Sequence, residues 1–315
     1  MQIVILDAKT LKVEELDLSP WRALGTLSLY DRTDPLLVPQ RLRGADVVLT
    51  NKVRLTAEAL KGAAALKMIG VLATGYDVVD VQAARALNIP VCNGPGYATG
   101  SVTESVFGFL LEMTRRTAQN TLRIRQGAWT ACPEFCWWEQ APLSLEGRTL
   151  GVVGCGAIGS RVAAVGQAFG MRVLGYARRK HPDFPGEQVP LERLLSEAYV
   201  ITLHCPATAE NAGFVNEETI ARMKDGALLI NTARGSLVIE GDVAAALASG
   251  KLGGYGADVV SREPMDIHNP LLKAPNCYLT GHSAWATVEA RQRIVDVTAQ
   301  SIRGVLLGNP VNVVN

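Results

Sequence analysis

The stretch Thr149-Leu-Gly-Val-Val-Gly-Cys-Gly-Ala-Ile-Gly-Ser160 decides the fold. The β-branched pair Val152–Val153 predicts a strand, and the apolar, Ala-rich segment after Gly159 predicts a helix. Gly154 lets the backbone turn, Gly156 has no Cβ to block a pyrophosphate, and Gly159 lets helix and strand pack closely. In this context the G-x-G-x-x-G spacing indicates a dinucleotide site, with the phosphates on the positive N-terminus of the helix. An ordinary glycine-rich turn is the weaker alternative.

The end of the next predicted strand, Arg172–Tyr176, indicates which dinucleotide is bound. An NAD site has Asp or Glu there, roughly 20 residues after the motif, to accept hydrogen bonds from the ribose 2′-OH. This chain has Ala177 at that position, followed by three cations, Arg178, Arg179 and Lys180. Guanidinium groups bind phosphate bidentately, and no carboxylate is present to repel a 2′-phosphate. The sequence therefore favours NADP(H), with NAD(H), and a merely solvated basic loop, as the alternatives.

Composition is typical of a soluble globular protein and excludes several functions. The 315 residues are 48% hydrophobic and 19% charged with a net charge of +1, so two domains fit and nothing favours nucleic acid or a membrane. The chain starts on a predicted strand rather than a signal peptide, and no uncharged apolar stretch reaches the roughly 18–20 residues of a membrane span. No second Cys/His pair accompanies Cys132 and Cys136. We expect a cytoplasmic protein without a metal site.

The first 98 residues alternate strands and helices, which predicts a small parallel sheet covered on both faces. The expected strands are Ile3–Leu6, Val47–Leu49, Met68–Val71 and the segment at Val91; the expected helices are Ala57–Ala63 and Val81–Leu87, with N-caps at Thr56 and Asp80. The loop Leu72-Ala-Thr-Gly-Tyr-Asp77 follows a strand end, where open α/β sheets bind ligands. Its N–H groups fit a small carboxylate, although a plain turn is an equal alternative from local sequence.

A long helix, about 102–126 and stopped by Gly127, is expected after Gly94-Pro-Gly96 breaks this alternation. The aromatic segment Trp129-Thr-Ala-Cys-Pro-Glu-Phe-Cys-Trp-Trp138 then fits an interface or core packing equally well. The last expected helix, about 288–307, can cross back onto the first domain and leave a cleft between the halves. In between, the pattern predicts six strands: Leu150–Val153, Arg172–Tyr176, Val200–Leu203, Ala227–Ile230, Gly254–Asp258 and Cys277–Leu279.

Three ionisable residues follow predicted strands after the glycine motif: Arg234, Glu263 and His282. All three should therefore lie at the sheet edge that binds the cofactor. Reduction of a 2-keto acid uses these types, because Arg binds the carboxylate and carbonyl, His donates a proton, and a carboxylate keeps the His protonated and oriented. His204, also at a strand end, is the rival to His282.

Five motifs together resemble those of the D-isomer-specific 2-hydroxyacid dehydrogenases in order and spacing, along essentially the whole chain. They are Gly154-Cys-Gly-Ala-Ile-Gly159, Leu203-His-Cys-Pro206, Met223-Lys-Asp-Gly226, Ile230-Asn-Thr-Ala-Arg-Gly235 and Asp258…Glu263-Pro264. The resemblance implies an α/β fold of two domains with the active site in the cleft. A Rossmann-type doubly wound parallel sheet (99–287) would be inserted into a flavodoxin-like substrate domain (1–98 and 288–315).

The resemblance also implies roles for individual residues. Arg234, Glu263 and His282 would be the catalytic trio, and Asp258 would bind the nicotinamide carboxamide. The cofactor-binding set, which includes the glycine motif and the basic loop, is Gly154, Gly156, Ala157, Ile158, Gly159, Ala177, Arg178, Arg179, His204, Cys205, Pro206, Thr232, Ala233, Arg234, Asp258 and His282. The substrate-binding set is Lys52, Ala73, Thr74, Gly75, Arg234, His282 and Trp138, the last bordering the pocket of a neighbouring subunit.

Within the family, His282-Ser-Ala-Trp-Ala286, Glu289-Ala-Arg-Gln-Arg293 and the ending Pro310-Val-Asn-Val-Val-Asn315 look most like the glycerate dehydrogenase, or hydroxypyruvate reductase, branch. That implies reduction of hydroxypyruvate or glyoxylate to D-glycerate or glycolate by a homodimer joined through about 101–140. Two departures affect substrate preference: Gly281 replaces the usual Pro before the catalytic His, and Tyr255-Gly256 alters a small-apolar pattern. D-lactate, a branched 2-keto acid or phosphoglycerate are alternative substrates, and a nucleotide-sensing, corepressor-like binding protein is the alternative of another class.

Overall fold

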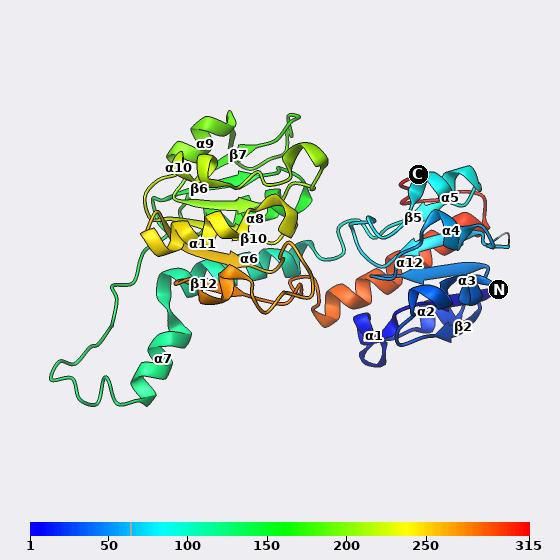
Figure 1. Ribbon diagram of the computed structural model, residues 1–315, viewed down its shortest axis with the longest axis horizontal. Coiled ribbons are helices and arrows are strands. Elements are labelled where there is room, and N and C mark those ends of the chain that lie inside the picture. The colour runs from blue at the N-terminus through cyan, green and yellow to red at the C-terminus, as the bar shows by residue number, and fades with distance from the viewer. Residues whose placement is uncertain (64) are drawn as a thin grey trace. The chain divides into compact units, whose positions relative to one another are not determined.

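The protein, seen here as a computed structural model that describes residues 1–63 and 65–315, consists of two compact units. The first unit contains Met1–Ala98 and Trp285–Asn315, and the second contains Thr99–Ala284. The sequence placed the second boundary at 287–288, three residues after the division seen here. Each unit has its own sheet (Figure 1).

The first unit has a five-stranded, wholly parallel sheet in the order β2-β1-β3-β4-β5. This is the strand order of flavodoxin-like sheets: after β1 and β2 the chain returns to the other side of β1 to add β3, so the order, but not the direction, of the strands reverses there. The sequence missed β2 because this edge strand has no fully buried residue and so lacks an apolar run. The strands are β1 (Gln2–Ile5), β2 (Thr26–Leu29), β3 (Val47–Thr50), β4 (Met68–Val71) and β5 (Val91–Cys92).

Helices cover both faces of this sheet. On one face Val4, Val48 and Ile69 pack with buried residues of α3, α4 and α5. On the other, α12 packs against β4 and α2. Thr56 and Asp80 cap α4 and α5 as expected, but α4 ends at Leu60 rather than Ala63. The helices are α1 (Ala8–Leu11), α2 (Ser19–Arg22), α3 (Val38–Leu42), α4 (Ala57–Leu60), α5 (Val81–Ala86) and α12 (Val288–Leu306).

The second unit has a seven-stranded parallel sheet in the order β12-β11-β10-β9-β6-β7-β8. The strand of the glycine motif, β6, lies where the order reverses, which is the Rossmann arrangement and confirms the expected fold class. The sequence predicted all of these strands except the two-residue β8. The strands are β6 (Thr149–Val153), β7 (Arg172–Tyr176), β8 (Glu187–Gln188), β9 (Val200–Leu203), β10 (Ala227–Asn231), β11 (Leu252–Ala257) and β12 (Cys277–Leu279).

Side chains alternate across the second sheet and join it to two helical layers. Along β10, Leu228 and Ile230 pack with α6 and α8, whereas Leu229 packs with α9, α10 and α11. This alternation follows from the period of two in a strand. The helices are α6 (Thr99–Arg115), α7 (Thr117–Arg125), α8 (Ala157–Ala168), α9 (Leu191–Glu197), α10 (Glu217–Ala221) and α11 (Glu240–Ser249). Short 3₁₀ turns occur at Val13–Glu15, Pro35–Leu37, Ala209–Asn211, Gly235–Leu237 and Pro270–Lys273.

The prediction of one helix over about 102–126 is wrong. The chain begins a helix at Thr99 and breaks it at Arg116, whose left-handed backbone (φ +51°) separates α6 from α7. No residue of α7 is buried, and α7 with the segment that follows projects from the layers of the second unit (Figure 1). We call residues 117–142 the arm. It exposes large apolar side chains, among them Leu122 (56%), Trp129 (48%), Phe135 (89%) and Trp138 (54%).

Candidate active site

The glycine turn after β6 is closed on two sides and open on the third. A Cβ on Gly154, which has φ +103°, would lie 2.5 Å from the backbone nitrogen of Cys205. One on Gly159 would lie 1.9 Å from the carbonyl oxygen of Gly154. Only glycine fits at these two positions, because backbone atoms cannot move aside. A Cβ on Gly156 would meet no atom within 4 Å, so this side of the turn leaves room for a ligand.

The helix that follows presents its N-terminus to that room. The first hydrogen bond within α8 runs from Ser160 N to Gly156 O at 2.8 Å, so the N–H groups before Ser160 have no partner inside the helix. No side-chain oxygen caps this end at Gly156. Such N–H groups and the positive end of the helix dipole stabilise phosphate. The turn and helix therefore fit the pyrophosphate of a dinucleotide.

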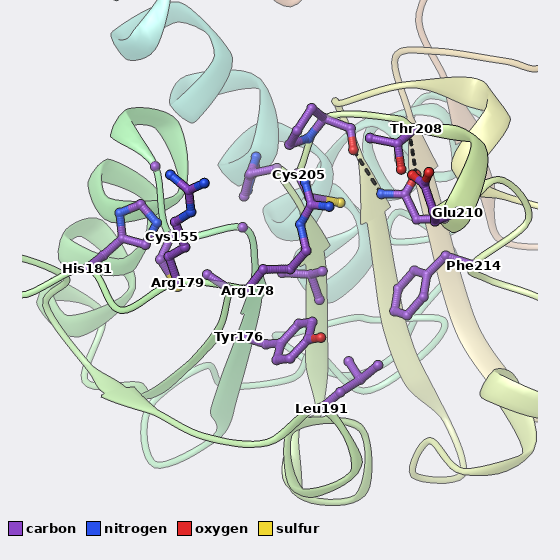
Figure 2. A pocket seen from close by; sticks show the side chains of 17 residues that line it. Cys155, Tyr176, Arg178, Arg179, His181, Leu191, Cys205, Thr208, Glu210 and Phe214 are labelled. Carbon is purple, nitrogen blue, oxygen red and sulfur yellow. Dashed lines mark hydrogen bonds between the residues drawn. The ribbon is translucent and has the colours of Figure 1, made fainter.

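A pocket of about 780 Å³ lies beside this turn. Figure 2 shows Arg178, Arg179 and His181 entering it from the segment after β7, and Thr208 and Glu210 from the segment after β9. The pKa of the Glu210 carboxyl is lowered, chiefly by a hydrogen bond from Thr208. Two guanidinium groups face one carboxylate, which suits an anionic ligand. The other lining residues are Val153, Gly154, Cys155, Gly156, Tyr176, Ala177, Leu191, His204, Cys205, Pro206, Asn211 and Phe214.

His204 lines this pocket as a neutral side chain. Desolvation lowers the pKa of its partly buried imidazole to about 3, and within the described residues no carboxylate bonds to the ring to favour its charge. Its Nε2 lies 2.9 Å from Oγ1 of Thr202, a buried residue of β9. A histidine that stays neutral across the physiological range is unsuited to donating a proton. Of the two strand-end histidines, His204 is thus the one whose surroundings oppose proton donation.

His282 has the opposite surroundings. It follows β12, and its Nδ1 lies 2.6 Å from Oε2 of Glu263, which is in the loop after β11. The other carboxylate oxygen accepts a hydrogen bond from Val260 N at 3.2 Å, which fixes the carboxylate in place. The imidazole is 25% exposed, so it remains accessible to a small molecule. The structure therefore brings together two of the three residues that the sequence selected.

Arg234 follows β10, so the three predicted residues come after three adjacent parallel strands, at one edge of the sheet. Its backbone is held by Asn231, which is fully buried: Asn231 Nδ2 donates to Arg234 O at 2.9 Å, and Asn231 Oδ1 accepts from Ala233 N at 3.0 Å. The buried hydroxyl of Tyr255 is hydrogen-bonded to Asn231, and burial raises its pKa. Sequence reasoning missed Asn231, although its place directly before the Arg234 turn was a usable signal.

Asp258 holds the loop that carries His282. The residue is 2% exposed, and its Oδ1 accepts from Thr280 Oγ1 (2.6 Å) and Ser283 N (2.8 Å). Its Oδ2 accepts from Ala284 N (2.9 Å), and its carbonyl oxygen accepts from His282 N (2.7 Å). The backbone of His282 is in the left-handed region (φ +53°), a conformation that costs on the order of 1–3 kcal/mol in a non-glycine residue. The bonds to Asp258 hold the loop in this conformation. The predicted contact of Asp258 with the nicotinamide stays a prediction.

The remaining predicted residues occupy three places. In the first unit, Ala73, Thr74 and Gly75 follow β4, where Thr74 Oγ1 donates to Gly94 O at 2.8 Å and Gly94 N to Ala73 O at 2.9 Å. Lys52 follows β3 and is exposed. Trp138 lies in the arm and is not among the residues that line the 780 Å³ pocket. Thr232, directly after β10, has a buried hydroxyl without a hydrogen-bond partner among the described residues.

Comparison with known proteins identifies the family. Residues 107–284 match the model of the D-isomer specific 2-hydroxyacid dehydrogenase, NAD binding domain. The chain belongs to this dehydrogenase family. It is 42% identical over 321 residues to a hydroxypyruvate reductase of Blautia hydrogenotrophica, with 100% of each chain covered. It is 39% identical over 289 residues to a glycerate dehydrogenase of Methylorubrum extorquens, with 90% of each covered.

A solved structure shows the same architecture over the whole chain. The TT0316 protein of Thermus thermophilus superposes with a TM-score of 0.86 at 33% identity, with 100% of each chain covered. This dehydrogenase is therefore an NAD(P)-dependent enzyme that reduces 2-keto acids. No helix in the part of the chain that the structure describes is long and apolar enough to cross a membrane. Within residues 1–63 and 65–315, no cluster of His, Cys, Asp and Glu side chains could hold a metal ion.

Proposed function

We propose that the protein reduces hydroxypyruvate or glyoxylate, with a preference for NADPH over NADH, to D-glycerate or glycolate. The observation that carries the reaction is the 2.6 Å pairing of His282 with Glu263 at the sheet edge that also carries Arg234 and the glycine turn. The names of the two similar proteins, a hydroxypyruvate reductase and a glycerate dehydrogenase, support the choice of substrate.

The chemistry needs one proton donor and one anion anchor from the protein. Arg234 binds the substrate carboxylate and polarises the keto oxygen. His282 donates a proton from Nε2 to the developing alkoxide, because Nδ1 is engaged by Glu263. Glu263 stabilises the imidazolium and fixes its orientation. The cofactor, when bound, supplies a hydride to the keto carbon.

The preference for NADPH rests on Arg178 and Arg179. Both are exposed at the pocket after β7, where position 177 is Ala rather than an acid (Figure 2). The nearest acid of the lining, Glu210, comes from the opposite segment after β9. A 2′-phosphate would be stabilised by both guanidinium groups. The adenosine half of the cofactor would lie in this pocket, with the pyrophosphate on Gly156 and the start of α8.

Substrate and subunit contacts complete the proposal. The N–H groups at Thr74 and Gly75 and the side chain of Lys52 would hold the substrate carboxylate from the first unit. The arm would join two subunits into a homodimer, since its exposed apolar side chains need a partner surface. Trp138 would then border the pocket of the neighbouring subunit. Light scattering that gives a monomer at micromolar concentration would contradict this part.

The test is steady-state kinetics with a panel of 2-keto acids and both cofactors. We expect the highest kcat/KM with hydroxypyruvate or glyoxylate, and with NADPH. Arg178→Ala should lower kcat/KM for NADPH by about 10–100-fold, because it removes one charge-assisted contact with the phosphate. The kcat/KM for NADH should change little. Arg85→Ala, an exposed arginine of the first unit, is the matched control. A parent that prefers NADH overturns the cofactor preference, and turnover of pyruvate or branched keto acids alone overturns the substrate.

A further inference from the structure

A second pocket, of about 570 Å³, lies wholly within the first unit. Its walls are the segments that follow β1, β2 and β3, the three neighbouring strands at one side of the sheet. Because these strands are parallel, all three segments lie at their carboxyl edge. The lining residues are Asp7, Thr10, Arg32, Thr33, Pro35, Lys52, Val53, Arg54, Thr56 and Ala59. None of them belongs to the catalytic trio or to the turn at Ala73–Gly75.

The pocket lies at the point where the order of the sheet reverses. In the order β2-β1-β3-β4-β5, the chain turns back between β1 and β3. Segments leave such neighbouring strands toward opposite faces, which opens a crevice at their carboxyl ends, and open α/β sheets bind ligands there. In the second unit this position belongs to the glycine turn. The first unit has a crevice of the same kind. Of the residues that line it, only Lys52 has a role in the proposed reduction of a keto acid.

The charge of the lining is positive. Arg32 and Arg54 are exposed, and within the described residues neither guanidinium has an ion-pair partner. Lys52 adds a third cation. The acid of the lining, Asp7, is buried and its carboxylate is already engaged: Oδ2 accepts from Lys52 N (2.6 Å) and Val53 N (3.1 Å), and Oδ1 from Asn51 N (3.0 Å). These backbone donors offset its charge, so the arginines are left to bind an anion.

Both walls are fixed from behind. Asp7 anchors the segment that leads to Arg54, as just described. On the opposite wall, Thr33 is buried and its hydroxyl donates to Leu6 O, while Arg41 donates to Thr33 Oγ1 and to Arg32 O (2.7 Å). Arg41 is itself held over the ring of Tyr30 at 3.8 Å. The backbones that carry Arg32 and Arg54 therefore do not have to be ordered when a ligand arrives, which favours affinity.

We propose that this pocket binds a small organic phosphate through Arg32 and Arg54. Guanidinium groups recognise phosphate oxygens bidentately, and the hydroxyl of Thr56, which accepts from Ala59 N, keeps its own proton as a donor for the same group. The volume exceeds that of a phosphate ion, so the ligand carries a short organic body. The pocket shares no lining residue with the proposed NADP(H) site: its residues belong to the first unit, and those of the 780 Å³ pocket belong to the second.

The test is hydrogen exchange of the full chain with glycerol 3-phosphate as the probe, in the presence of saturating NADP⁺. We expect slower exchange in peptides that cover 31–37 and 50–58. In Arg32→Ala/Arg54→Ala, calorimetric titration should show a Kd at least tenfold higher than in the parent. Arg22→Ala/Arg85→Ala, two exposed arginines of the same unit, should bind like the parent.

Three outcomes would overturn the proposal. Protection confined to peptides around 176–182 would place the phosphate in the cofactor pocket alone. Equal Kd values for the parent and Arg32→Ala/Arg54→Ala would remove the two arginines from the site. Binding no tighter than that of chloride at the same ionic strength would leave only general electrostatic attraction. Because the readout does not depend on turnover, a failure of the proposed keto acid reduction would be seen separately.

Discussion

The loops that carry His204 and His282 follow strands of one sheet, β9 and β12, yet they give their histidines different hydrogen-bond partners. The ring of His204 is partly buried in the wall of the 780 Å³ pocket and bonded to the hydroxyl of Thr202. That of His282 is partly exposed and bonded to the carboxylate of Glu263. Desolvation favours the neutral form of the His204 imidazole, whereas the carboxylate of Glu263 fixes the orientation of the His282 ring. Position at a strand end thus places both histidines at the same edge of the sheet, and their neighbours give them different surroundings.

The largest expected difference between the two loops is in turnover. His282→Ala should lower kcat for hydroxypyruvate by about 10²–10⁴-fold, since it removes the proposed proton donor. His204→Gln keeps a group that can bond to Thr202, so its kcat should stay within about tenfold of the parent. Steady-state kinetics at saturating NADPH makes the comparison. If His282→Ala reduces every short 2-keto acid within a few-fold of the parent, the catalytic assignment is wrong.

Much of this site could be predicted from the sequence, because its determinants are local. The glycine spacing after a β-branched run, and ionisable residues in the segments that follow β10, β11 and β12, need no knowledge of distant contacts. The network around Asp258 could not be predicted, since its donors lie 22–26 residues further along the chain. The break at Arg116 was missed because no Gly or Pro interrupts the helical pattern there.

The Asp258 network gives the second comparison, because within residues 1–63 and 65–315 no carboxylate hydrogen-bonds to the His204 loop in the way that Asp258 holds the His282 loop. In Asp258→Asn one oxygen becomes an NH₂ donor, which cannot accept the bonds from Thr280 and Ser283, or from Ala284. A lost buried acceptor costs about 1–3 kcal/mol. We expect kcat to fall about 10–100-fold, since the left-handed backbone of His282 loses its support. Thermal unfolding and kinetics, with Asp225→Asn (a surface acid bonded to Lys251) as control, measure both effects. An unchanged kcat would show that the loop of His282 keeps its conformation without the hydrogen bonds to Asp258.

The third comparison concerns acid stability. Between pH 6.5 and 3 the unfolded chain protonates His204, whereas the folded chain, with a pKa of about 3 at this residue, does not. The unfolded state then binds more protons, so the stability of the fold falls as the pH falls in this window. From pH 6.5 to 5 the loss from this residue is about 2 kcal/mol. Urea unfolding at the two pH values should show a smaller loss in His204→Gln, and an equal loss would mean that the folded protein does protonate this ring.

The smallest expected effect comes from replacing the glycine next to each histidine loop, Gly281 beside His282 and Gly154 beside His204. Gly281, before His282, has its φ outside the left-handed region, and a Cβ there would meet no atom within 4 Å. Gly281→Ala should therefore raise stability by about 0.4–1 kcal/mol by restricting the unfolded chain, and leave kcat within about twofold. Gly154, which touches the backbone of His204 and Cys205, should not tolerate the same change, because its Cβ would lie 2.5 Å from Cys205 N. A stabilised Gly281→Ala with a much lower kcat would show instead that His282 needs the mobility that glycine gives its loop.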